Sequence, residues 1–311
     1  MGADCANKRH GGFTLIELSI VLVIIGLIVG GILVGQNLIS AAGVRATISQ
    51  LEQYSTAVNT FREKYGYLPG DIPAQSATQF GFAARGSQPG QGDGNGIIEG
   101  YWGGQAVGNE EGSGETLLFW QDLSAVHMVE GNYSAIGNGT ANIPSPGISG
   151  ITLSQYYPQA KLGRGNYIVA FSSGGLYAGP WYSTGLNYFS VSGISAVNWA
   201  NSCVPTAAPG LTVAEAYSID KKIDDGIPTQ GRVIALTLSG PSQFWPYWMN
   251  GDPMTNGPGV VFPPNQTANT PSATTCYDNG GVANKTNAYS INQNNGAGVN
   301  CALSFQFQAG D

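Results

Sequence analysis

The sequence is short of charged residues and of histidine. Asp, Glu, Lys and Arg make up only 10% of its 311 residues, against about 25% in an average soluble domain. Glycine, at 46 residues, and a broad supply of Ser, Thr, Asn and Gln take their place. This composition is typical of an extracytoplasmic, loop-rich protein.

Catalytic signatures are also missing. The two histidines are His10 and His127, and no GxSxG or comparable nucleophile motif accompanies them, so a Ser-His-Asp or Cys-His hydrolase would depend on His127. Paired carboxylates of the glycosidase type have no fixed spacing in sequence and stay open. We predict no catalytic residue and no enzymatic activity.

The chain has no excess of basic residues. Its formal net charge is −7, and without the first twelve residues it holds 18 acidic and 10 basic residues, a charge of −8. Binding to nucleic acid requires a basic face that neutralises phosphates. We therefore expect no nucleic-acid partner.

No CxxC pair occurs among the four cysteines, which disfavours a zinc ribbon or a thioredoxin-type site. Beyond Cys5 the cysteines are Cys203, Cys276 and Cys301. One disulfide and one spare thiol is the simplest arrangement in an oxidising compartment. We favour Cys276 with Cys301, because this bond would tie down an Asn- and Gly-rich stretch; Cys203 as a partner and three unpaired thiols are the alternatives.

A long hydrophobic run begins close to the N-terminus. Residues 18–34 read LSIVLVIIGLIVGGILV, seventeen residues in which Ser19 is the only polar side chain. With FTLI before Glu17 the run is long enough to cross a bilayer core of about 30 Å as a helix rising about 1.5 Å per residue. Glu17 interrupts it, and a carboxylate at that depth is costly without a cationic partner, so we interpret Glu17 as functional.

The residues around this run indicate its orientation. Lys8 and Arg9 precede it, which favours a cytoplasmic N-terminus and an exported remainder. The small residues in ILVGQNLISAAG would also suit an ordinary signal peptide cleaved near residue 43, so a secreted hydrolase with such a signal is an alternative class.

The string GGFTLIELSIVLVIIGLIVGG at residues 11–31 resembles the leader and N-terminal helix of type IV prepilins and type II secretion pseudopilins. The resemblance implies cleavage by prepilin peptidase between Gly12 and Phe13, N-methylation of Phe13, and assembly with other subunits on an inner-membrane platform. Glu17 could pair with the N-terminal amine of a neighbouring subunit and so set the register between packed helices.

The helical pattern continues beyond the membrane. Apolar residues recur at steps of three and four, which predicts one amphipathic helix ending before Gly66 and Pro69. These residues are Val44, Ile48, Leu51, Tyr54, Val58, Phe61 and Tyr65. We expect a leader at residues 1–12, an assembly helix at 13–65 and a globular head at 66–311 with a long loop at about 249–300.

The head is expected to combine helices with an antiparallel sheet, which makes the fold class α+β. Two helices are predicted, at residues 110–129 and 212–224, the second with a Thr212-x-x-Glu215 capping box. Strands are predicted at 167–171, 186–191, 233–238 and 303–307. The segment from 249 to 300 is rich in Asn, Thr, Gly and Pro, which is typical of a surface excursion or a poorly ordered segment.

One loop carries possible metal ligands. The segment Gln91 to Ile98, QGDGNGII, resembles the start of an EF-hand calcium loop, in which oxygen ligands alternate with glycines. The candidate ligands are Asp93, Asn95 and Glu99; a glycine-rich turn without metal is the alternative. Asp220, Asp224 and Asp225 form a second acidic group, which we interpret as a solvated helix end, with metal binding as the alternative.

Together these features favour a structural subunit of a type II secretion pseudopilus or a type IV pilus. Such a subunit is anchored in the bacterial inner membrane by one span, with its head in the periplasm, before it enters a filament. The competing hypothesis is an adhesin-like binding module displayed on a pilin anchor. Apart from calcium, no cofactor is expected.

Overall fold

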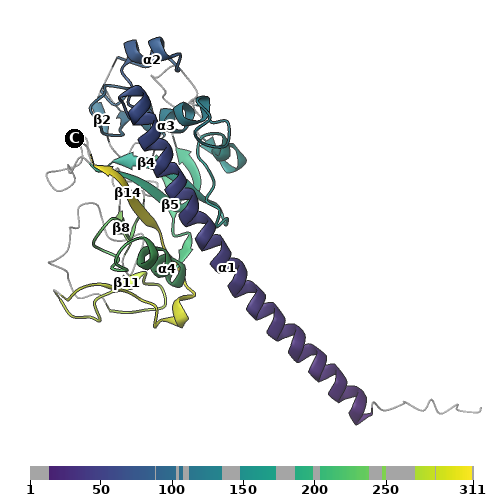
Figure 1. The fold of residues 1–311 in the computed structure, drawn as a ribbon. Helices are drawn as coiled ribbons and strands as arrows, with labels where there is room; N and C mark the ends of the chain where they lie inside the picture. Colours follow the sequence, from purple (N-terminus) through teal and green to yellow (C-terminus); the bar gives the residue numbers. More distant parts are fainter. Residues whose placement is uncertain are drawn as a thin grey trace, which may run out of the picture. The chain divides into compact units, whose positions relative to one another are not determined.

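The computed structural model describes residues 14–87, 89–102, 105–107, 112–134, 148–172, 186–198, 204–237, 247–249, 270–283 and 285–309. It confirms the α+β class, with a long N-terminal helix and a head that contains antiparallel strands and further helices (Figure 1). The helices are α1 (Leu15–Tyr65), α2 (Ala74–Phe80), α3 (Gly114–Ala125) and α4 (Val213–Ile223), with 3-10 turns η1 (Gly150–Gln155) and η3 (Asn294–Gly296).

The strands are short except in the main sheet. They are β1 (Gly100–Trp102), β2 (Gln105–Val107), β3 (Ile148–Ser149), β4 (Asn166–Ser172), β5 (Leu186–Asn198), β6 (Val204–Ala208), β7 (Leu211–Thr212), β8 (Val233–Ile234), β9 (Leu236–Thr237), β10 (Tyr247–Trp248), β11 (Tyr277–Asp278), β12 (Ala288–Tyr289), β13 (Val299–Cys301) and β14 (Leu303–Ala309).

Helix α1 is continuous over 51 residues and ends at Tyr65, as predicted. Its end follows from Gly66, which takes a left-handed φ of 79° while its N–H bonds to the carbonyl of Arg62 at 2.8 Å. Contacts divide the chain between Ala42 and Gly43, so the two parts of α1 belong to different compact units.

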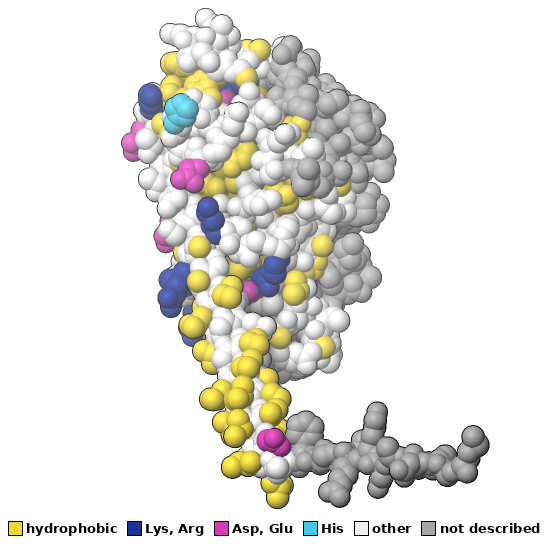
Figure 2. Space-filling model, turned by 90° about the vertical axis from the view of Figure 1, so that its right-hand side faces the viewer, with side chains coloured by type: hydrophobic (Ala, Val, Ile, Leu, Met, Phe, Trp, Pro, Cys, Tyr) yellow, Lys and Arg dark blue, Asp and Glu magenta, His cyan; other side chains and the backbone are white. Residues whose placement is uncertain are grey.

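The first part of α1, up to Ala42, is long and apolar enough to be a candidate membrane span, by length and composition. Its large hydrophobic side chains are exposed on all sides, and Figure 2 shows them around one acidic group. A helix that is apolar all round is stable only where lipid or other helices surround it. Within the described chain, no other element covers this part of α1, so its surface requires lipid or the helix of another molecule.

The second part of α1 docks on the head through one stripe. The buried apolar residues recur at helical spacing, as the sequence predicted; they are Val44, Ile48, Leu51, Tyr54, Val58 and Phe61. Thr47 and Gln50 lie buried on the same face and bond to the segment before β4. The hydroxyl of Thr47 accepts the N–H of Leu162 at 2.9 Å, so polar contacts as well as apolar burial fix the helix.

The main sheet has six antiparallel strands arranged around β5. The first half of β5 pairs with β14 and β4, and its second half pairs with β6 and β3. Strand β8 extends the sheet beyond β14. All seven residues of β4 are buried, which places this strand inside the head rather than at a solvated edge.

An aromatic cluster joins α1 and α3 to this sheet. The ring of Phe189 on β5 lies 4.1 Å from Phe307, 5.8 Å from Trp120 and 6.2 Å from Tyr54, measured between ring centroids. Phe119 completes the contact between α3 and β14, 5.7 Å from Phe307. Large aromatic side chains contribute much apolar burial each, so this cluster forms the centre of the head's core.

Helix α4 is held at both ends. Its capping box is formed: the hydroxyl of Thr212 accepts the N–H of Glu215 at 3.1 Å, and the Glu215 carboxylate accepts the N–H of Thr212 at 2.9 Å. Glu215 also pairs with Arg164 at 2.5 Å. Gly226 follows the helix with a φ of 77°. The predicted helix at 212–224 is thus confirmed.

Other elements differ from their predicted bounds. The helix predicted at 110–129 is α3, which begins at Gly114 and ends at Ala125, since His127 has a φ of 58° that no right-handed helix accommodates. The strand predicted at 233–238 is divided at Ala235 into β8 and β9, because β8 pairs with β14 and β9 pairs with β10.

The described part of the predicted 249–300 loop, Met249 with residues 270–283 and 285–300, holds short ordered elements. It contains β11, β12, η3 and β13, and it buries Cys276, Tyr277 and Tyr289. Cys276 and Cys301, the pair favoured from the sequence, form a disulfide across 25 residues. Cys203 lies outside the described residues. The disulfide and the two tyrosines supply the order that the segment's few aliphatic residues do not.

Candidate functional site: the N-terminal helix and a buried carboxylate cluster

Glu17 lies in the first turn of α1, where it also caps the helix. Its carboxylate accepts the N–H and the hydroxyl of Thr14, both at 2.8 Å, and the Thr14 hydroxyl accepts the N–H of Glu17 at 3.3 Å. This is the reciprocal arrangement of a capping box, which the spacing Thr14-x-x-Glu17 could have revealed. Gly12 and Phe13 lie outside the described residues.

The surroundings of Glu17 indicate a role beyond capping the helix. It is the only charged side chain of the described chain before Ala42, and its neighbours Leu15, Ile16 and Leu18 are exposed apolar residues. A carboxylate on such a surface is solvated only until lipid or another helix covers that surface, and it then requires a cationic partner. No such cation lies in this part of α1.

A second site is the carboxylate cluster, formed by Asp71, Asp93 and Glu115. One oxygen from each lies within 4.8 Å of the others. Asp71 follows the turn after α1, Asp93 belongs to the glycine-rich loop before β1, and Glu115 lies in the first turn of α3. Asp71 and Glu115 are buried, whereas Asp93 is exposed.

The glycine-rich loop wraps around the two buried carboxylates through its backbone. Asp71 accepts the N–H of Gly94 at 2.6 Å and of Gly96 at 2.8 Å. Glu115 accepts the N–H of Gly92 and of Glu99, both at 2.9 Å. The loop can present these N–H groups because its alternate glycines take φ values of +79° to +96°, a conformation that disfavours side chains.

Asp71 and Glu115 are buried and lie close to other acids, and both conditions raise their pKa values. Burial raises the pKa of Asp71 to about 7, and it raises the pKa of the neighbouring buried Glu99 to about 7. The pKa of Glu115 is raised by burial and by the charges of Asp71 and Asp93. No Lys or Arg in the described ranges forms a salt bridge with these groups; Arg85 pairs with Asp122 at 2.5 Å instead.

The three metal-ligand candidates expected from the sequence occupy different places in the structure. Of the three candidates, Asp93 joins the cluster. The amide oxygen of Asn95 accepts the N–H of Ile97 at 2.7 Å, and its nitrogen faces Glu99 at 3.3 Å. Asn95 therefore supports the loop and Glu99. The grouping of Asp71 and Glu115 with Asp93 could not be predicted, because they lie 22 residues to either side of Asp93 and no local motif joins them.

The second acidic group stabilises the turn that follows α4. Asp220 is buried, unlike the solvated helix end we expected, and accepts the hydroxyl of Tyr289 at 2.8 Å and the N–H of Gly226 at 3.1 Å. Asp224 accepts the N–H groups of Arg232 and Val233. Burial raises the pKa of Asp220 to about 6. These bonds account for the group without a ligand.

Comparison with protein families identifies one match. Residues 7–33 match the family model of the prokaryotic N-terminal methylation motif. Comparisons of the chain with curated proteins and with solved structures find no match. The matched residues include Gly12, Phe13, Glu17 and most of the apolar run. This chain carries the prepilin-type signature of type IV pilins and pseudopilins at the start of its long helix.

Proposed function

We propose that this chain is a structural subunit of a type II secretion pseudopilus or a type IV pilus. Prepilin peptidase cleaves it between Gly12 and Phe13 and methylates the new N-terminus. The inner membrane holds it by the first part of α1, with the head in the periplasm, until an assembly platform adds it to a filament. Its partners there are the helices of other subunits.

One observation carries this proposal: a methylation motif runs directly into a helix whose first part is apolar on every side and carries a single carboxylate. Such a surface gains stability by exchanging lipid for the equivalent surface of another helix. The carboxylate fixes the stagger between two packed helices, because it is neutralised only when the amine of a neighbouring subunit lies beside it. A soluble function alone would require neither feature.

Sheared filaments test the proposal. We expect the chain in the sheared surface or overexpressed-pseudopilus fraction of cells that contain prepilin peptidase, and in the membrane fraction alone of cells that lack the peptidase. A membrane protein without a filament role would show the same distribution in both strains, which contradicts the proposal. The measurement is an immunoblot of both fractions with an antibody against the head.

We further propose that the carboxylate cluster binds one calcium ion. Its support is the convergence of Asp71 and Glu115 on Asp93 from three separate segments. Oxygen-only ligands suit calcium, which accepts six to eight oxygens in flexible geometry. Asp71, Asp93 and Glu115 would hold the ion, which supplies the positive charge that three adjacent carboxylates need. The role is structural: the ion would fasten the glycine-rich loop to α3.

A further inference from the structure

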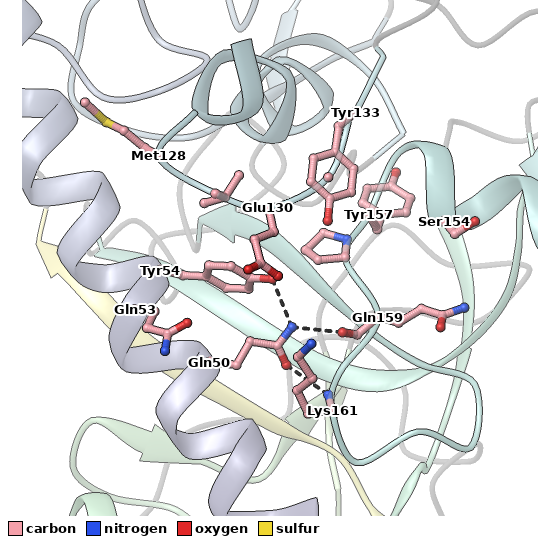
Figure 3. Close-up of a pocket in the computed structure, with 13 residues that line it drawn as sticks. Gln50, Gln53, Tyr54, Met128, Glu130, Tyr133, Ser154, Tyr157, Gln159 and Lys161 are labelled. Carbon is pink, nitrogen blue, oxygen red and sulfur yellow. Dashed lines mark hydrogen bonds between the residues drawn. The ribbon is translucent and has the colours of Figure 1, made fainter. Parts of the chain in front are cut away.

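A cavity of about 430 Å³ lies in the head beside the second part of α1 (Figure 3). Its walls are the α1 turn from Gln50 to Tyr54, the loop after α3 from Met128 to Tyr133, and the segment from Ser154 to Lys161. Sites for small molecules are typically about 300–1,000 Å³. The cavity is therefore of the size that holds a small organic ligand.

The base of this cavity is rigid because Gln50 uses its whole amide. Its nitrogen donates to the hydroxyl of Tyr54 and to the carbonyl of Gln159, and its oxygen accepts the N–H of Lys161, each at 2.9 Å. Gln50 is itself buried. Since the Tyr54 hydroxyl accepts the proton of Gln50, its own proton remains available to a ligand.

Several polar groups around the cavity have no protein partner among the described residues. They are the exposed side chains of Glu130, Lys161 and Gln53 and the hydroxyl of the half-buried Tyr133. Figure 3 shows Glu130 beside Tyr54, and the Tyr133 hydroxyl on the far side of the same space from Lys161. These groups include hydrogen-bond donors, acceptors and groups that are both.

Aromatic rings lie behind and beside the cavity. Tyr54, Tyr133 and Tyr157 come from three separate elements; Tyr157 is fully buried and Tyr54 is 8% exposed, so the half-buried Tyr133 is the ring that a ligand can reach most fully. Tyr54 and Tyr133 lie 4.9 and 6.2 Å from the buried ring of Trp120, measured between centroids, so their positions are set by the core. A tyrosine held in place in this way offers the exposed part of its ring and a polar end at low entropic cost.

We propose that this cavity binds one or two rings of a neutral saccharide. One carboxylate and one ammonium balance each other, which favours neither an anion nor a cation, and a wholly apolar ligand would leave the polar groups of the walls without hydrogen bonds. A sugar ring has an apolar C–H face for tyrosine and a rim of hydroxyls that both donate and accept hydrogen bonds. This function goes beyond the filament role and gives the head a ligand class.

Full-length protein in detergent micelles tests the proposal. The probes are an array of neutral mono- to tetrasaccharides built from glucose, galactose, mannose and N-acetylhexosamines, followed by calorimetry with the strongest hit. We expect Glu130→Gln and Lys161→Met each to weaken binding by about tenfold, the loss of one hydrogen bond to a charged group. Glu52→Gln, on α1 but outside the cavity, should leave binding unchanged.

Equal binding by all variants, or no binding by any saccharide, overturns the proposal, provided that thermal melts show the same folded state. Loss of filament incorporation by Glu130→Gln without saccharide binding would assign the cavity to a neighbouring subunit, and it likewise overturns the proposal. Saccharide binding by purified protein that never enters filaments would support the cavity and contradict the filament role, so the two proposals fail separately.

Discussion

The Glu17→Ala variant should insert into the membrane normally and be depleted from filaments by at least about tenfold. Removing one partner of a buried ion pair costs about 3–5 kcal/mol, and each 1.4 kcal/mol corresponds to a factor of ten. The apolar run of α1 is untouched by the substitution, so insertion has no reason to change. The measurement is the ratio of the chain in sheared filaments to the chain in membranes.

Two further variants separate the charge of Glu17 from its capping role. Glu17→Gln keeps an oxygen that can accept the N–H of Thr14 but removes the charge, and we expect it to fail as Glu17→Ala does. Thr14→Ala removes the cap hydroxyl but keeps the carboxylate, and it should assemble nearly normally, since a lost cap costs about 1 kcal/mol. Normal assembly of Glu17→Gln with failure of Thr14→Ala would contradict the ion-pair account.

Calcium should raise the melting temperature of the full-length protein in detergent micelles by about 5–10 °C at a hundredfold excess over its dissociation constant. Asp93→Asn should abolish most of this gain, because it removes one ligand charge while Asn can still accept the N–H of Asn95. Asp225→Asn is the matched control, since Asp225 is also exposed and accepts one N–H two residues on, that of Ile227. Loss of the gain in Asp225→Asn but not in Asp93→Asn would contradict the assignment.

The metal-free protein should also show a pH dependence of defined sign. The pKa values of Asp71 and Glu99 are about 7 in the folded head, above ordinary values of about 4. Folded protein therefore holds more protons than unfolded protein, so in chelator the melting temperature should fall between about pH 4 and pH 7. Asp220, with a pKa of about 6, acts in the same direction. Calcium should reduce the fall by stabilising the ionised cluster.

Local signals explain which parts of the fold could be predicted. Helix α1 followed from periodicity sustained over many turns and from Gly66 and Pro69 beyond its end, and α4 followed from its capping box and Gly226. The division of the strand at Ala235 could not be predicted, because its cause is a change of pairing partner distant in sequence.

The candidate sites differ in the same way: the local motif could be predicted from the sequence, and the sites formed by packing could not. The methylation motif is contiguous in sequence, so its presence could be predicted directly. The carboxylate cluster joins residues 71, 93 and 115, and the cavity joins α1 to residues more than a hundred positions away. Only the packing of α1 and α3 onto the sheet brings these groups together, and no spacing rule encodes that packing.

The mature N-terminus is the most direct test of the filament-subunit account. Mass spectrometry of the protein purified from membranes should identify an N-terminal peptide that begins at Phe13 and carries one added methyl group on its amine. A mature chain that begins near residue 43, or one that retains its first twelve residues in cells with an active prepilin peptidase, would contradict the account.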